Sequence, residues 1–545
     1  MSELLPPSPL GAALDSAHVG DIEGAFGTIR LGDEDARPGF KARFKTLLAV
    51  VGPGLIVMTG DNDAGAFSTY AQAGQNYGTS LLWVLLLLVP VLYVNQEMVL
   101  RLGVVSGVGH ARLILERFGK FWGAFSVVDL FILNALTIIT EFIGISLGLD
   151  YLGLPKIPGI FLAAAVIIAA ASTGSFKRFE QVCLTLVFGS LLLVPIIVMV
   201  HPHVGQAARD FLIPGIPHDA DLSKVVLLII GIVGTTVAPW QLFFQQSYII
   251  DKRITPRFMT YEKVDLWLGI VIVIVGAAAI MAFTAATFAN HGEFGNFSDA
   301  GGVALGLEKY VSKTAGVLFA LALIDASIIG AAAVGLSTSY ALGDVLGLRH
   351  SLHRKISEAK IFYAVFAGIL VVSGVIVLIP GSPLGLLTTG VQVLAGVLLP
   401  SATVFLLLLC NDKEVLGPWV NGRGMNIFTS TVIAVLIILS LVLTASVLFP
   451  DLGSSAIIGI LVGGSVLFAA GGVGFLAYRA FHPAGVADVM VDRTGRSSWR
   501  MPPLALLAAP KLSATSRIGL TVMRSYLLIA MILVIVRVVQ LALAR

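Results

Sequence analysis

The sequence predicts an all-α polytopic membrane protein, and three observations support this class. Hydrophobic residues fill 57% of the 545 positions and charged residues only 12%, which is too little charge to cover the surfaces of soluble domains. Apolar runs long enough to cross a bilayer recur along the whole chain. Two of these runs are interrupted by glycine, proline and polar residues. The first two observations exclude a soluble enzyme, and a net charge of +3 gives no reason to expect nucleic-acid binding.

The apolar segments predict twelve or thirteen membrane spans. They lie near residues 45–73, 79–100, 121–148, 157–173, 180–200, 224–250, 264–288, 315–344, 361–380, 384–410, 426–449, 455–478 and 518–543. The last segment contains Arg524 and Arg537, so it could instead lie along the membrane interface. Lysine and arginine concentrate in alternate loops, which places the N-terminus in the cytoplasm and suggests the inner (plasma) membrane.

Composition also suggests how the chain is divided. Residues 1–40 are polar and rich in glycine, proline and acids, as expected of a disordered cytoplasmic tail. Residues 41–415 hold the first ten spans and form the expected transporter core. Residues 416–545 would add further C-terminal spans, with a proline-rich cytoplasmic linker over 479–517.

The first and sixth spans are both broken. The first contains Gly52–Gly54 and then Gly60–Asp63, and the sixth contains Gly234–Pro239. Proline removes a backbone donor and glycine lowers helix propensity, so both spans should unwind. Because lipid cannot form hydrogen bonds with the freed backbone groups, the breaks should be buried in protein or line a wet cavity. The breaks occupy corresponding positions in two five-span halves, about 45–200 and 224–411. This arrangement predicts the LeuT-type inverted repeat of a secondary transporter, formed by spans 1–5 and 6–10, with two or three extra C-terminal spans. Simple helix kinks are the alternative.

Two carboxylates, Asp61 and Asp63, lie in the first break. A charge near the bilayer centre costs roughly 2.5–3.5 kcal/mol, so each one needs a reason. Two such close carboxylates repel each other unless a cation or a proton intervenes. A divalent cation would satisfy both, and oxygen ligands suit Mg²⁺, Ca²⁺ or Mn²⁺. In the structural alternative, one aspartate caps the second half-helix.

Four further polar side chains are expected inside the membrane, namely Glu97, Glu141, Asp325 and Gln392. Each carboxyl group could relay protons or stand behind the metal ligands. Equally, each could simply be hydrogen-bonded within the bundle. Gln392 could face the cavity or pack in the core.

These motifs resemble those of the NRAMP divalent-metal transporters. The resemblance rests on the first span, whose family signature is Asp-Pro-Gly-Asn, on the end of span 2, on span 6, whose signature is Met-Pro-His, and on span 10 with the loop after it. The matching stretches are Gly52–Gly74, Arg101–Gly107, Gly234–Ser247, Val391–Val393, Leu399-Pro400 and Asn411-Asp412. Together they cover roughly residues 45–415.

The resemblance implies a set of metal ligands. Asp63 matches the family's metal-binding aspartate, and Gln392 matches a glutamine that approaches the metal. Gly60 and Thr235 fall where the family uses backbone carbonyls. Glu141 matches a family glutamate, which suggests an outer-shell or relay role.

The departures from the family pattern bear on which ion is carried. Ala66 stands at the position of an asparagine ligand, and Ala238 at that of the methionine whose thioether contacts the metal. Trp240 and Gln245 replace two histidines, and Ile138 replaces an aspartate of the proton route. Because a thioether favours soft ions, its loss favours a hard, partly hydrated ion.

This pattern is similar to the NRAMP-related magnesium transporters, which lack the methionine. The expected function is import of Mg²⁺, with Mn²⁺ as a second candidate ion, by alternating access and without proton coupling. Asp61, which is outside the usual signature, would add a further hard ligand. The alternatives are a proton-coupled Mn²⁺/Fe²⁺ symporter and, in another class, a carrier of an organic solute on the same fold. No enzymatic activity and no cofactor are expected. The expected partners are the metal substrate and the lipid bilayer, and the protein is expected to be a monomer.

Overall fold

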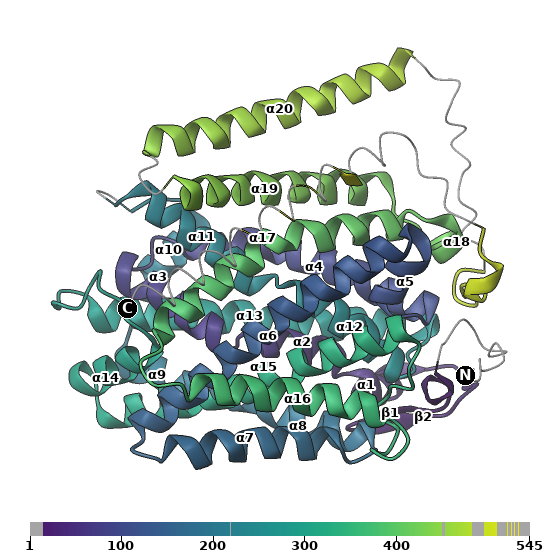
Figure 1. The fold of residues 1–545 in the computed structure, drawn as a ribbon, viewed down its shortest axis with the longest axis horizontal. Coiled ribbons are helices and arrows are strands. Elements are labelled where there is room, and N and C mark those ends of the chain that lie inside the picture. The colour runs from purple at the N-terminus through teal and green to yellow at the C-terminus, as the bar shows by residue number, and fades with distance from the viewer. Residues whose placement is uncertain are drawn as a thin grey trace.

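The computed structural model describes residues 15–217, 220–449, 453–481 and 495–508, together with five single positions between 520 and 532. Most of the long helices run side by side in one bundle (Figure 1). A two-stranded hairpin, α5 and α18 lie at one end of the bundle, called here the N-terminal face, and α10 and α14 lie at the other end. Each span can therefore be described as running between the N-terminal face and the opposite end of the bundle.

The first half of the bundle begins with a bent and broken span. Its helices are α1 Gly39–Val50, α2 Pro53–Asp61, α3 Ala64–Tyr77, α4 Leu82–Ser106, α5 His110–Phe118, α6 Lys120–Tyr151, α7 Lys156–Ala171, α8 Phe176–Gly189, α9 Leu193–Val200 and α10 Val204–Leu212, with a 3₁₀ turn, η2, at Ser190–Leu192. The axis turns by 53° between α1 and α2, where Gly52 has φ 149° and Pro53 starts the new helix. The early break predicted at Gly52–Gly54 is therefore a bend.

The second half repeats this order. Its elements are α11 Leu222–Thr236, α12 Pro239–Asp251, the 3₁₀ turn η3 at Pro256–Phe258, α13 Met259–Phe288, α14 Ala300–Tyr310, α15 Lys313–Leu346, α16 Lys360–Val377 and α17 Leu384–Cys410. The halves interlock, because α13 packs on α2 and α3, α15 packs on α6, and α17 packs on α6 and α3. The core is thus shared between them.

Local sequence fixes several helix ends. Asp299 and Ser312 cap α14 and α15 by accepting backbone N–H groups of Gly302 and Ala315, which satisfies donors that the first turn leaves free. Gly347 ends α15 in the left-handed conformation, with φ 63°, a conformation that glycine adopts without steric cost.

After the core come α18 Lys413–Leu416, the 3₁₀ turn η4 Gly417–Trp419, α19 Arg423–Leu448, α20 Ser454–Phe481 and the 3₁₀ turn η6 Leu504–Leu506. Figure 1 shows α20 outside the rest of the bundle, where it contacts chiefly α19. Its large exposed side chains, among them Val462 and Leu467, are apolar, as suits a helix facing lipid.

The prediction of twelve or thirteen spans exceeds what the described residues contain. Ten helical segments are long and apolar enough to cross a membrane, or eleven if the bent pair of α1 and α2 is one span. The difference comes partly from 157–173, where α7 is a shorter apolar helix. The segment 518–543 lies almost wholly outside the described residues.

The prediction of a disordered tail over residues 1–40 is wrong for its second part. Ser16–His18 form a 3₁₀ turn, η1, and Ile22–Gly24 (β1) pairs antiparallel with Gly27–Ile29 (β2). Ile22, Gly24 and Ile29 of this hairpin are buried, and both strands pack on α1. Low hydrophobicity suggested disorder, but contacts with distant parts of the chain supply the ordering energy. Residues 1–14 lie outside the described part.

The described part of the linker over 479–517 also packs on the N-terminal face. The N–H of Met501 donates to the Val105 carbonyl at 3.1 Å, and the Trp419 indole donates to the Arg496 carbonyl at 2.8 Å. Helix α20 extends to Phe481, three residues into the range predicted as linker.

Candidate metal site

The first break lies where α2 ends at Asp61 and α3 begins at Ala64. Asp63 is the N-cap of α3, and its Oδ1 accepts the N–H of Ala66 at 2.8 Å. The side chain of Asn62 donates to the Val273 carbonyl of α13 at 3.2 Å. The capping role considered for the two aspartates therefore belongs to Asp63. One carboxylate oxygen suffices for the cap.

The second break lies between α11, which ends at Thr236, and α12, which begins at Pro239. Proline suits the first position of a helix, because its N–H would have no partner there. Ala238 is extended, with φ −87° and ψ 143°. Both breaks are therefore where the sequence predicts them, each two residues long.

The two breaks are in direct contact. The Tyr70 hydroxyl of α3 lies 2.7 Å from the Thr236 hydroxyl at the end of α11. The Gln241 amide of α12 donates to Oδ1 of Asp61. A Cβ atom added to Gly60 would lie 3.7 Å from the Trp240 ring. The end of α2 thus faces the start of α12, as the inverted-repeat model requires.

Gln392 of α17 reaches this point as well. A Cβ atom added to Gly65 would lie 1.7 Å from the amide nitrogen of Gln392 and 3.1 Å from Oδ1 of Asp63. A larger residue at position 65 would displace the glutamine amide from this place. Gln392 is therefore buried beside the first break, next to Asp63.

Glu141 of α6 approaches the first break from another side. Its Oε2 accepts the N–H of Ala64 at 3.1 Å. A Cβ atom on Gly330 of α15 would lie 2.8 Å from this oxygen and 3.0 Å from Cβ of Asp63. The two carboxyl side chains therefore meet at the same small residue, which places Glu141 directly behind Asp63.

These carboxyl groups are buried without a cationic neighbour. Asp61, Asp63 and Glu141 are 1%, 3% and 0% exposed. Among the residues that the structure describes, none of the ion pairs within 4.0 Å involves any of the three. A buried charge without a partner is strongly unfavourable. The site therefore needs a cation or protons to be stable.

Several polar atoms at the breaks have no hydrogen-bond partner in the described part of the chain. They are Oδ2 of Asp61, Oε1 of Glu141, Oγ1 of Thr235 and Nε2 of Gln392. Gly60 and Thr235 also lie in the last turns of α2 and α11, where carbonyl groups run out of helical partners. Buried unsatisfied polar atoms are rare in native proteins, and an ion or water that binds there explains them.

The donor set contains no sulfur or imidazole at the positions that the resemblance marks. Ala66 and Ala238 are buried and offer only methyl groups, and Trp240 is 1% exposed. Within the described ranges, no group of three or more histidine, cysteine, aspartate and glutamate side chains could hold a metal ion. Any bound cation would therefore need carbonyl, amide or water oxygens in addition to carboxylates.

Glu97 and Asp325 lie elsewhere. Glu97 forms ion pairs with Arg101 at 3.1 Å and with Lys263 at 2.9 Å, so its role is the structural one. Asp325 is half-buried on α15, where a Cβ on Gly189 would touch it, and nothing places it near the breaks.

Sequence reasoning missed Gln241. Its amide donates to Asp61, and its carbonyl accepts the Gln96 amide of α4 at 2.9 Å. One turn further on, Gln245 is fully buried and neither of its polar atoms has a partner in the described residues. The signal was available in the sequence: two glutamines four apart in an apolar helix share one face.

A family model described as natural resistance-associated macrophage protein-like matches residues 54–446. The chain belongs to this family. The match contains both breaks and every predicted ligand position, so the NRAMP resemblance is confirmed; the magnesium branch stays a prediction.

Relatives in the family are named transporters. The divalent metal cation transporter MntH of Ralstonia nicotianae is 29% identical over 402 residues, covering 70% of this chain and 87% of the relative. The MntH protein of Lacticaseibacillus casei is 28% identical over 432 residues, covering 74% and 91%. These names agree with the expectation of a transporter rather than an enzyme.

A solved structure shows the same fold. The manganese transporter of Eremococcus coleocola, in complex with an aromatic bis-isothiourea compound, superposes with a TM-score of 0.62 at 22% identity, covering 82% of this chain and 96% of the other. The LeuT-type helical architecture predicted from the two breaks is therefore confirmed.

Proposed function

We propose that this family member carries a divalent metal cation across the membrane, with Mg²⁺ as its main substrate and Mn²⁺ as a second one. The observation that supports this is the group of buried carboxylates at the two breaks, which have no cationic partner among the described residues. A divalent ion held by Asp63, Asp61, Gln392 and the carbonyls of Gly60 and Thr235 would neutralise them.

The choice of ion follows from the missing ligands. With alanine at positions 66 and 238, the site offers oxygen donors and no thioether. Mg²⁺ binds with several waters retained and prefers such ligands, whereas a thioether would favour softer ions. The name of the structurally similar manganese transporter of Eremococcus coleocola favours Mn²⁺ as the second ion.

Uptake would proceed by alternating access, with each break opening in turn to one side. The N-terminal face is the cytoplasmic side in this proposal, because basic residues concentrate there. The membrane potential supplies about 4.6 kcal/mol per divalent ion at 100 mV, so proton coupling is not required. Ile138 and Gln245 cannot exchange protons where the family pattern has titratable groups.

Transport into liposomes tests the proposal. Wild type should take up Mg²⁺ without acidifying the lumen, and Asp63→Asn should not take it up. Acidification of the lumen during metal entry would contradict transport without proton coupling. Uptake of Mn²⁺ by a protein that takes up no Mg²⁺ would favour the symporter alternative.

A matched variant tests the placement of the site. Ala238→Met restores a thioether at the second break, so Cd²⁺ affinity should rise about tenfold, which corresponds to about 1.4 kcal/mol. Ala66→Met adds the same thioether in the first turn of α3, at the position of the missing asparagine. Comparison of the two variants shows whether the gain in Cd²⁺ affinity depends on where the sulfur is placed. Unchanged Cd²⁺ affinity in Ala238→Met would show that the ion binds elsewhere.

A further inference from the structure

The N-terminal segment crosses the N-terminal face and contacts both halves of the bundle. We propose that residues 15–29, called the strap, are a latch that holds this face closed and must undock before an ion can leave through it. The proposal rests on the alternating-access transport proposed above. Its basis is a set of polar contacts from the strap to the ends of helices that belong to different halves.

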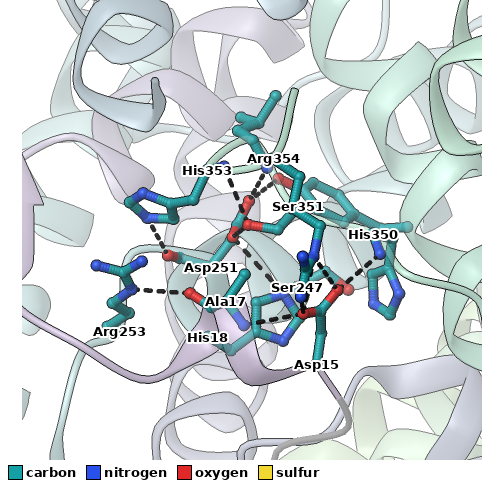
Figure 2. Close-up of polar contacts among 12 residues, drawn as sticks. Asp15, Ala17, His18, Ser247, Asp251, Arg253, His350, Ser351, His353 and Arg354 are labelled. Carbon is teal, nitrogen blue, oxygen red and sulfur yellow. Dashed lines mark hydrogen bonds and ion pairs between the residues drawn. The ribbon is translucent and has the colours of Figure 1, made fainter. Parts of the chain in front are cut away.

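The first anchor of the strap is Asp15. Its carboxylate accepts Nε and Nη2 of Arg354 at 2.6 to 3.1 Å, and it also accepts the N–H of His350 at 2.9 Å (Figure 2). Both partners lie in the loop between α15 and α16. Asp15 is only 2% exposed. Bidentate contact with arginine is a strong and directional interaction.

The second anchor is the end of α12, the inner half of the broken sixth span. Arg253 donates to the carbonyls of Ala17 and Asp21 at 2.9 and 3.0 Å. The His18 ring nitrogen lies 3.6 Å from Oδ1 of Asp251, the last residue of α12. The strap thus joins the end of a broken span to the α15–α16 loop.

Asp251 also ties α12 directly to that loop. It accepts the Tyr340 hydroxyl at 2.6 Å and the Leu352 N–H at 2.8 Å, and Ser351 donates to it as well at 2.5 Å. The strap therefore covers and reinforces a junction that must separate if α12 moves away from α15.

The third anchor is α8, in the first half. The Ala25 N–H donates to Oε2 of Glu180 at 2.6 Å, and Gln181 donates to the Ala25 carbonyl at 3.1 Å. Oε1 of Glu180 pairs with Lys252 at 2.6 Å, and Lys252 also donates to the Val51 carbonyl at the bend between α1 and α2. One glutamate therefore links the hairpin, the fifth span and both broken spans.

The other flank of the strap is less tightly packed. A cavity of about 1050 Å³ lies between it, the end of α4 and residues 497–503, and is lined by His18, Arg30, Arg253 and Arg500 among others. The strap is thus attached mainly by polar anchors along one side. Its buried apolar side chains are Ile22, Ala25 and Ile29 of the hairpin, and a short segment with one solvated flank is typical of segments that open locally.

The test uses cysteine labelling in nanodiscs, in a background with Cys183→Ala and Cys410→Ala. Gln245→Cys reports opening of the bundle, because Gln245 is fully buried on α12 and loses no hydrogen bond. Ala25→Cys reports undocking of the strap, since Ala25 is 4% exposed. Asp15→Arg should raise the maleimide labelling rate at both positions at least about tenfold.

Two controls make the result specific. The double variant Asp15→Arg/Arg354→Asp restores an opposite-charge pair and should return both rates toward those of wild type. Glu293→Arg breaks the exposed pair with Lys309, 2.8 Å long, on the other end of the bundle, and should change neither rate. If Asp15→Arg does not fold, Asp15→Asn serves in its place.

The proposal is overturned if Ala25→Cys becomes reactive while Gln245→Cys does not, since the strap would then be a cover and not a latch. It is also overturned if neither rate changes in a folded variant. The assay contains no metal, so failure of Mg²⁺ transport in liposomes would leave the labelling result intact and would count against the proposed ion only.

Discussion

The acids at the two breaks and the acids at the N-terminal face are equally well buried, but they are neutralised differently. At the N-terminal face Glu180 pairs with Lys252, with both side chains 0% exposed, and Asp15 pairs with Arg354. At the breaks Asp61 and Asp63 have no such partner in the described chain. Since a lone buried charge costs several kcal/mol, this difference separates acids that hold the fold together from the acids that bind the ion in the proposed function.

The division is not complete. Glu262 of α13 is fully buried, and neither of its oxygens has a hydrogen-bond partner among the described residues. It shares the electrostatic influence of Lys252 with Glu180 and Asp265. Lys252 pairs directly with Glu180 and also lies close enough to act on the two other acids.

Removing that lysine should have the largest effect. Lys252→Met leaves Glu180 buried without a cation, and the free energy of unfolding should fall by about 3–5 kcal/mol. Thermal unfolding in detergent measures this loss. Lys309→Met is the matched control, because its pair with Glu293 is exposed and should contribute nothing measurable. Equal stability of both variants would erase the distinction between the two regions.

The break should behave in the opposite way. Asp63→Asn removes a charge that the protein does not pair, so the ion-free protein should be as stable as wild type or more so. Wild type should gain about 2.7 kcal/mol at a metal concentration one hundred times Kd, and the variant should gain none. Metal-dependent shifts in melting temperature compare the two. A large loss of stability in the ion-free variant would mean that Asp63 is structural.

Gln241 and Gln245 give a smaller contrast within one helix. Gln241→Leu removes a donor to Asp61 and an acceptor for Gln96, so it should destabilise the protein by about 1–3 kcal/mol. Gln245→Leu removes an amide without a partner in the described residues and should be neutral or stabilising. Chemical unfolding in detergent ranks the two variants, and the reverse order would contradict the hydrogen-bond assignment.

The smallest expected effect concerns pH. Burial lowers the pKa of His350, but the Asp344 carboxylate, 3.0 Å away, and Asp15 outweigh burial and raise this pKa to about 9. His18 and Tyr340 are the other titratable groups whose rings face His350. A raised pKa stabilises the fold below the unfolded value near 6.5, and this contribution is lost as pH rises through 9.

The melting temperature should therefore fall between pH 7 and pH 10, and His350→Gln should flatten that decline. A variant with the same slope as wild type would show that another group titrates. Asp15 acts at the other end of the scale: burial raises its pKa, but the Arg354 hydrogen bonds and the nearby His18 charge bring it down to about 2. Its contribution is present above about pH 4 and is lost only as pH falls through 2.

The sequence predicted the breaks well because their causes are local. Glycine, proline and an N-capping aspartate unwind and restart a helix in any surrounding, so Gly60–Asp63 and Gly234–Pro239 were sufficient. The location of Asp63 near Gln392 followed from the repeat and the family pattern. Gln241 was missed although its spacing from Gln245 marks a polar face, because that spacing does not show which partner a glutamine will reach.

The strap could not be predicted for the converse reason. Its residues are polar, and its order depends on Arg253, Glu180 and Arg354, which are between 155 and 339 positions away along the chain. The hairpin has only three residues in each strand, too short for an alternating pattern to stand out. Contacts between distant residues, not intrinsic propensity, determine its structure.

Isothermal titration of Mg²⁺ into the purified wild type and Asp63→Asn tests most directly whether the unpaired acids form an ion site. The account predicts saturable binding at one site per chain in wild type, and no binding in a folded Asp63→Asn. Equal binding by both proteins, or no binding by wild type, would contradict it.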